Sequence, residues 1–128
     1  MHNMHDSSEN YLEAIVVLHR QLGHVRSVDV ANHLDLSRAS VSNAMKKLEE
    51  EGHVIMKEDG ELTLTPSGER IGTNIDERHQ VIRKLLINIG VKPETADDDA
   101  CKVEHAISQE TFLRIKEAIQ EEVKEEEK

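Results

Sequence analysis

The sequence predicts a mainly α-helical protein: an N-terminal winged helix-turn-helix with a two-stranded wing, then a helical dimerisation domain. Three observations lead to this fold class. Apolar residues recur at intervals of three and four over most of the chain, which is helical spacing. The period changes to alternation between residues 53 and 65, around the hairpin turn signal Asp59-Gly60. A tight turn, Asp35-Leu36-Ser37, separates two of the helices before that hairpin.

Three helices are predicted before the hairpin, over residues 7–22, 27–35 and 38–51. Their N-termini carry residues that favour N-caps, namely Ser7 or Ser8, Ser27 and Ser37. Gly23 and Gly52 follow the last periodic residues of the first and third helices and are expected to end them. The hairpin strands are expected at residues 53–57 and 62–65.

Three further helices are predicted after the hairpin. The first runs from Pro66 to Ile89, with Thr65 as its cap and Gly90 as its stop. The others cover residues 93–106 and 108–121, and Ser108 caps the last. The tail EEVKEEEK is expected to be solvated and frayed. We place a DNA-binding domain at residues 1–73 and a metal-binding and dimerisation domain with an acidic tail at residues 74–128.

Composition narrows the class of protein. Of the 128 residues, 37% are hydrophobic and only 2% aromatic, so the core is thin and a second subunit is expected to cover part of it. One cysteine rules out an internal disulfide and favours a reducing, cytoplasmic location. The N-terminus does not read as a signal peptide, and no apolar run predicts a membrane partner. The net charge of -10 argues against non-specific coating of nucleic acid.

The helix predicted from residue 38 is the second helix of the helix-turn-helix, whose N-terminal residues meet base edges in the major groove. The residues expected there are small and mostly uncharged: Ser37, Arg38, Ala39, Ser40, Ser42 and Asn43. Asn43 could pair with adenine, and Arg38 with guanine or phosphate. Three lysines, Lys46, Lys47 and Lys57, are expected on phosphates. The simpler interpretation is a helical bundle with ordinary surface Ser and Lys.

Five potential metal ligands lie near the apolar faces of three predicted helices: Glu13, His79, Cys101, Glu104 and His105. Polar groups at core-facing positions cost free energy unless they are paired, and one divalent cation would satisfy all five. Mixed nitrogen, oxygen and sulfur ligands suit Fe(II), Mn(II), Co(II) or Zn(II). Taken singly, Cys101 is more simply a small buried hydrophobe and His79 a core histidine. The combination carries the metal hypothesis.

From about Ser8 to Ile119 the chain resembles the diphtheria-toxin-repressor and manganese-transport-regulator family (DtxR/MntR) of metal-activated bacterial repressors. The residues that carry the resemblance are Glu9-Asn10-Tyr11-Leu12-Glu13, Ser40-Val41-Ser42, Leu64-Thr65-Pro66-Ser67-Gly68, Arg78-His79 and Cys101-x-x-Glu104-His105. The resemblance implies a metal at the junction of the two domains and Asn10 as a further ligand. It also implies the short branch without an SH3-like domain.

The chain departs from both branches of that family. It has Asn10 and Cys101 where the manganese branch has Asp and Glu, and it has Glu13 where the iron branch lacks a carboxylate. Arg83 stands where the family usually carries Glu, and Asp97 at a histidine position of the iron branch. One metal site is therefore implied more clearly than a second, which the Arg83 cation would oppose.

The sequence thus predicts a homodimeric, metal-activated repressor of metal-uptake genes and not an enzyme. Cys101 tilts the ligand set slightly towards Fe(II), with Mn(II) next and Zn(II) or Co(II) possible in vitro. Two alternatives stay open. One is a winged-helix regulator that responds to a redox signal at Cys101 or to a small organic ligand. The other is a metal-dependent or Cys–His hydrolase, which the chain's lack of a glycine-rich phosphate loop disfavours.

Overall fold

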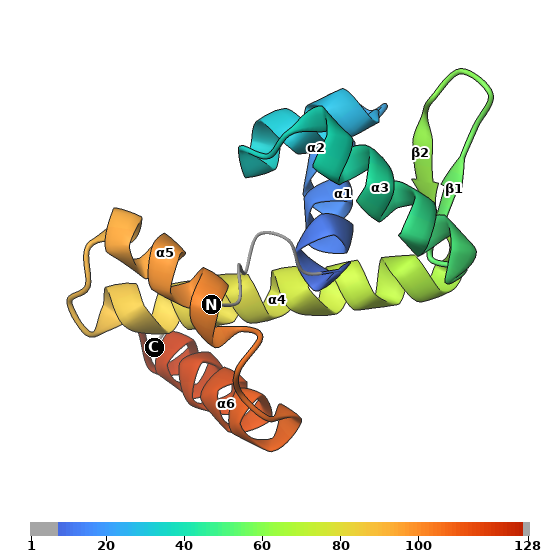
Figure 1. Cartoon of the computed structure of the whole chain (residues 1–128). Helices are drawn as coiled ribbons and strands as arrows, with labels where there is room; N and C mark the ends of the chain where they lie inside the picture. Colours follow the sequence, from blue (N-terminus) through green and yellow to red (C-terminus); the bar gives the residue numbers. More distant parts are fainter. Residues whose placement is uncertain (1–7, 127–128) are drawn as a thin grey trace. The chain divides into compact units, whose positions relative to one another are not determined.

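The computed structural model describes residues 8–126, and side chains as far as residue 121. Figure 1 shows the elements of this part of the chain. They follow in the order α1 (Ser8–Leu22), α2 (Ser27–Leu34), α3 (Arg38–Glu50), β1 (Val54–Met56), β2 (Leu62–Leu64), α4 (Pro66–Asn88), α5 (Pro93–Val103) and α6 (Gln109–Glu126). Packing divides the chain into two compact units, Met1–Asp76 and Glu77–Lys128. The predicted mainly helical class with a two-stranded wing is confirmed.

The predicted caps of three helices are confirmed. The Ser37 hydroxyl accepts the N–H of Ser40 at 3.1 Å and opens α3. The Thr65 hydroxyl accepts the N–H of Gly68 at 3.3 Å in the first turn of α4, and the Ser108 hydroxyl accepts that of Thr111 at 3.1 Å before α6. These local hydrogen bonds satisfy N–H groups that have no partner inside the helix, which explains why sequence spacing predicted these starts well.

Other predicted ends are corrected. Ser27 is not the cap of α2; Arg26 is, and its N–H is accepted by the carboxylate of Asp29 at 2.9 Å. The helix predicted to run to residue 106 ends at Val103. The last helix continues to Glu126 instead of ending at 121, because Glu and Lys are strong helix formers even in an acidic tail. Ser7 lies outside the described residues.

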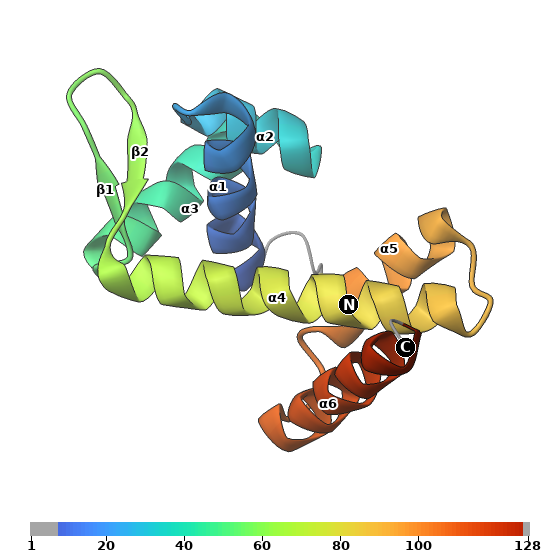
Figure 2. The ribbon, with the colours of Figure 1, turned by 180° about the vertical axis from the view of Figure 1, so that it is seen from behind.

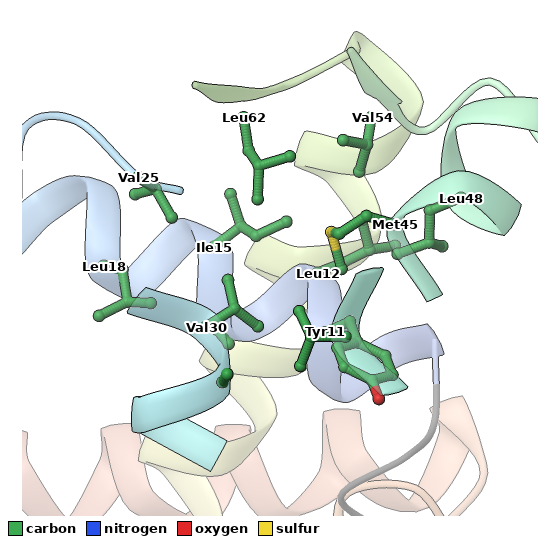
Figure 3. Close-up of a cluster of buried hydrophobic side chains, with 13 residues drawn as sticks. Tyr11, Leu12, Ile15, Leu18, Val25, Val30, Met45, Leu48, Val54 and Leu62 are labelled. Carbon is green, nitrogen blue, oxygen red and sulfur yellow. The ribbon is translucent and has the colours of Figure 1, made fainter. Parts of the chain in front are cut away.

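The core of the first unit is a single apolar cluster (Figure 3). Leu12 and Ile15 of α1 are fully buried, and Met45 and Leu48 of α3 lie against them in the same cluster. Val54 and Leu62 add the inner face of the wing, while Ile55, the residue after Val54 on β1, is exposed. The alternation in the wing thus places one side of each strand on the helices, as period two requires.

The wing is tied to the segment that joins α1 and α2. Its strands pair antiparallel, with Val54 opposite Leu64 and Met56 opposite Leu62. The N–H of Leu62 also donates to the carbonyl of Val25 at 2.7 Å, and Arg26 bridges to Glu61 as an isolated antiparallel pair. Figure 1 shows the hairpin standing beside α3. A third segment therefore steadies a hairpin that would be marginal by itself.

Two glycines let α4 approach other backbone closely within the first unit. A Cβ atom on Gly72 would lie 2.7 Å from the carbonyl oxygen of Leu12 in α1. A Cβ atom on Gly68 would overlap the carbonyl oxygen of His53, just before β1. Both neighbours are backbone and cannot swing aside. The start of α4 is therefore packed against α1 and the wing at distances that only glycine allows.

In the second unit, α5 and α6 lie against the C-terminal part of α4 (Figure 2). The residues buried there are mostly apolar, and they include Ile82, Ala96, Ala100, Phe112 and Ile119. A lysine of α6, Lys116, pairs with Glu77 of α4. Among the described helices, none combines the length and the apolar character needed to cross a membrane.

Replacing Gly68 with Ala is expected to destabilise the first unit by about 1–3 kcal/mol, because the added methyl must displace the backbone at His53. Urea unfolding followed by circular dichroism measures this loss. Thr73→Ala, at an exposed position of the same helix, is the matched control and is expected to change little. Equal stability of Gly68→Ala and the unchanged chain would contradict the close packing.

Candidate metal centre and DNA-contact surface

The predicted DNA-contact residues lie on the open face of α3. Its other face is anchored by three fully buried side chains, Val41, Met45 and Leu48. The residues predicted to contact DNA are exposed, apart from a half-buried Ser42: Ser37, Arg38, Ala39, Ser40, Asn43, Lys46, Lys47 and, on the wing side, Lys57. Amphipathic spacing thus presents small and basic side chains to solvent from one rigid helix.

The N-terminus of α3 is suited to a negatively charged partner. Its first turn holds no acidic residue, and Arg38 is exposed there. The hydroxyls of Ser37 and Ser40 lie 2.9 Å apart at this end. A helix N-terminus carries partial positive charge and favours phosphate. The start of this helix can therefore receive a nucleic-acid backbone as well as base edges.

The wing carries charges that sequence reasoning did not assign. Arg26 donates to the carbonyl of Asp59 at 2.6 Å, so an arginine from the α1–α2 link lies beside the wing tip. The backbone N–H of Glu61 lowers the pKa of Asp59, and Arg26 and Lys57 act in the same direction. A hydrogen bond from His24 lowers the pKa of Glu61. Arg26 was missed because its place at the wing depends on a tertiary bridge.

In the second unit, His79 of α4 lies between two carboxylates. Its Nδ1 is 2.9 Å from Oε2 of Glu104, and its Nε2 is 3.3 Å from Oδ1 of Asp97. The imidazole is largely buried, with 19% of the side chain exposed, while Glu104 is completely buried. The pair His79–Glu104 that the sequence predicted as metal ligands is thus brought together, and Asp97 joins it.

Glu104 has the unsatisfied chemistry expected of a cation ligand. Within the described chain its Oε1 accepts no hydrogen bond. Nε2 of His105 lies 3.3 Å away but not in hydrogen-bond geometry. A buried carboxylate oxygen without a hydrogen bond costs roughly 1–3 kcal/mol or more. The residues therefore fit a divalent cation, which would offset that cost through a bond to the carboxylate.

Arg78 holds the backbone that carries Glu104. One guanidinium nitrogen donates to the carbonyl oxygens of Glu104 and Ile107 at 3.1 and 3.0 Å. The other terminal nitrogen donates to Gln109 at 2.6 Å, and the guanidinium lies 5.3 Å from the centre of the Phe112 ring. These contacts give hydrogen-bond donors to two carbonyls in the segment that follows the end of α5.

The other predicted ligands have distinct positions. Cys101 is a half-buried thiol on α5. The N–H of Glu104 still donates to the carbonyl of Ala100 at 2.9 Å, so helical spacing between Cys101 and Glu104 is kept, whereas His105 lies beyond the helix. Asn10 is buried and Glu13 half-buried, three residues apart on α1 in the first unit.

The donor set of the second unit suits a first-row transition metal. It contains an imidazole, a buried carboxylate and a thiol one turn away on α5. Such mixed donors accept Fe(II), Mn(II), Co(II) and Zn(II) with differing preference. A groove in this unit is lined from α4 and α6, by Glu77, Val81 and Lys116 among others.

Two family models together match most of the chain. The model described as "Iron dependent repressor, N-terminal DNA binding domain" matches residues 3–62. The model described as "Iron dependent repressor, metal binding and dimerisation domain" matches residues 65–125. The HTH-type transcriptional regulator MntR of Lysinibacillus sphaericus is 32% identical over 89% of this chain and 82% of its own length. The transcriptional regulator MntR of Salmonella typhimurium is 38% identical over 81% of this chain and 66% of its own length.

Solved structures agree with these sequence matches. The crystal structure of IdeR from T. acidophilum has a TM-score of 0.79 and 29% identity, over 89% of this chain. A manganese-dependent transcriptional repressor in complex with manganese has a TM-score of 0.78 and 28% identity, also over 89% of this chain. The chain spans about half the length of these two chains, 54% and 53%.

Replacing Glu104 with Gln is expected to lower the affinity for Co(II). The loss of a residue that only hydrogen-bonds to a metal ligand costs roughly 10–100-fold, and the loss of Glu104 itself is expected to cost more. The amide keeps the shape of the side chain but removes its charge. Calorimetric titration and the visible absorption of Co(II) measure the loss. Glu94→Gln, exposed on α5, is the matched control. Undiminished Co(II) binding by Glu104→Gln would remove this residue from the ligand set.

Proposed function

The chain belongs to the iron-dependent repressor family, and from this premise we propose that it is a homodimeric, metal-activated transcriptional repressor of metal-uptake genes. The observation that carries the proposal is the buried Glu104 carboxylate beside His79, with one oxygen that accepts no hydrogen bond among the described residues. The same chain presents an exposed polar helix, α3, suited to the major groove. A repressor acts on chromosomal operators, so we propose a cytoplasmic location and no enzymatic activity.

We propose that the ligands are drawn from both halves of the sequence: Asn10, Glu13, His79, Cys101, Glu104 and His105. Support comes from their residue types and from the resemblance of the surrounding motifs to metal-activated repressors. When bound, Fe(II) or Mn(II) would offset the negative charge of the carboxylates. The same ion would bind residues that are distant in the sequence. The thiol of Cys101 favours Fe(II), and the carboxylates favour Mn(II).

We propose that residues 1–73 bind DNA and residues 74–128 bind metal and dimerise. In a dimer, two copies of α3 must match half-sites that are about 34 Å apart, or a multiple of that spacing. Because the proposed ligands come from both halves of the sequence, binding of the metal would affect how well the two α3 helices fit the half-sites. Linkage then requires that operator DNA raise metal affinity by the same factor by which metal raises DNA affinity. Partial neutralisation of carboxylates would also weaken repulsion from phosphate.

The proposed function predicts that operator binding rises with metal and that Glu13→Ala abolishes the rise. Fluorescence anisotropy measures the operator affinity. The DNA comes from the upstream promoter, and Fe(II), Mn(II) and Zn(II) are titrated separately under anaerobic conditions. Glu9→Ala removes the same charge from the same helix and is expected to respond to metal as the unchanged chain does. Tight binding that ignores both metal and chelator would overturn the proposal, and release by oxidant instead would point to redox sensing at Cys101.

Arg38→Ala is expected to weaken operator binding by about 1–3 kcal/mol, roughly 5–150-fold, because a bidentate contact at the start of α3 is lost. Metal affinity is expected to stay the same, since Arg38 is exposed and is not among the proposed ligands. Anisotropy and Co(II) titration of the same preparation separate the two effects. Arg114→Ala, exposed on α6, serves as the control. Loss of metal affinity with normal DNA binding would contradict the assignment of α3.

A further inference from the structure

Resting on the proposed metal-binding function, we propose that Asp97, held by Arg83, is a positioning residue for His79. In this arrangement Asp97 accepts the Nε2 proton of the imidazole, which leaves Nδ1 as the metal-binding atom. Arg83 keeps Asp97 from binding the metal, because its guanidinium cation is already paired with the Asp97 carboxylate. The three side chains thus decide which edge of the His79 ring faces the metal.

One carboxylate oxygen joins the three side chains. Oδ1 of Asp97 lies 2.6 Å from Nε of Arg83 and 3.3 Å from Nε2 of His79. His79 and Arg83 are four residues apart on α4 and therefore share a face of that helix. Asp97 reaches this face from α5. Both contacts fall within the second unit, where the same imidazole meets Glu104 through its other nitrogen.

The two edges of the His79 ring differ in charge. At the Nε2 edge, Arg83 contributes a permanently ionised guanidinium against Asp97, which disfavours a divalent cation there. At the Nδ1 edge, the fully buried Glu104 has an oxygen that accepts no hydrogen bond within the described chain. A cation therefore gains more at the Nδ1 edge. Partial exposure of Asp97, at 50% of its side chain, weakens the Nε2 contact without changing this order.

A histidine that binds metal usually donates its other ring N–H to a carboxylate or carbonyl. That partner fixes the tautomer and ring orientation and raises the basicity of the ligating nitrogen, and its loss typically costs about 10–100-fold in metal affinity. Asp97 stands in this relation to His79. Arg83 in turn limits the freedom of Asp97, since the guanidinium holds the carboxylate in a close ion pair.

The first test is Asp97→Ala in the full chain, titrated with Co(II) and followed by calorimetry and visible absorption. We expect affinity to fall about 10–100-fold and the Co(II) ligand-field bands to change, with thermal unfolding of the metal-free chain nearly unchanged. Asp98→Ala and Asp99→Ala remove the same charge from neighbouring exposed positions of α5 and are expected to match the unchanged chain. Arg83→Gln is expected to alter the Co(II) bands as well. Arg83→Lys keeps the positive charge and is expected to give the bands of the unchanged chain.

The second test is nuclear magnetic resonance of the His79 ring nitrogens in the Zn(II)-loaded chain. We expect the proton on Nε2 and the metal on Nδ1. The reverse arrangement would overturn the inference, and so would Asp97→Ala binding Co(II) with unchanged affinity and spectrum. Either result would leave the proposed function standing. If the unchanged chain binds no Co(II), Mn(II) or Fe(II), the proposed function and this inference both fall.

Discussion

The second unit depends on a carboxylate that has been removed from water. Glu104 is completely buried, and burial of a charged group is costly unless its oxygens are matched. His79 matches one oxygen, and Arg78 fixes the backbone by holding the carbonyl of Glu104. Two adjacent residues of α4 thus hold Glu104: His79 contacts its carboxylate, and Arg78 contacts its backbone carbonyl. The end of α5, the turn that follows it and the start of α6 are all arranged around this point.

The first unit solves a different problem, which is to expose polar residues on a rigid support. Buried Val41 and Met45 hold α3 against the apolar cluster, so its other face needs no packing partner within the unit. Close approaches at Gly68 and Gly72 leave no room for a side chain between α4 and its neighbours. Arg26 ties the wing to the link before α2. Rigidity here comes from backbone contacts and small residues more than from large aromatic side chains, of which the chain has few.

Charge connects the two chemistries. A chain with a net charge of -10 has an unfavourable long-range field for DNA, so its basic and polar contacts must act locally. Surface pairs such as Lys57 with Glu61 contribute little stability and leave lysines available to phosphate. A cation bound among carboxylates would reduce the unfavourable field and order the ligands in one event. An acidic repressor therefore suits regulation by metal better than a basic one, which would hold DNA without it.

Local features were determined by the sequence alone. Helical period, the caps at Ser37 and Ser108 and the Asp59-Gly60 turn depend on residues only a few positions apart, so α3, the wing and the starts of the later helices were predicted well. Tertiary structure decided the rest. The contact of Arg78 with the Glu104 carbonyl and the place of Arg26 at the wing both join residues that are far apart in the sequence. The complete burial of Glu104 and the pairing of Asp97 with Arg83 likewise depend on contacts between separate helices. Residue spacing within one helix carries no information about which side chains another helix will bring against it.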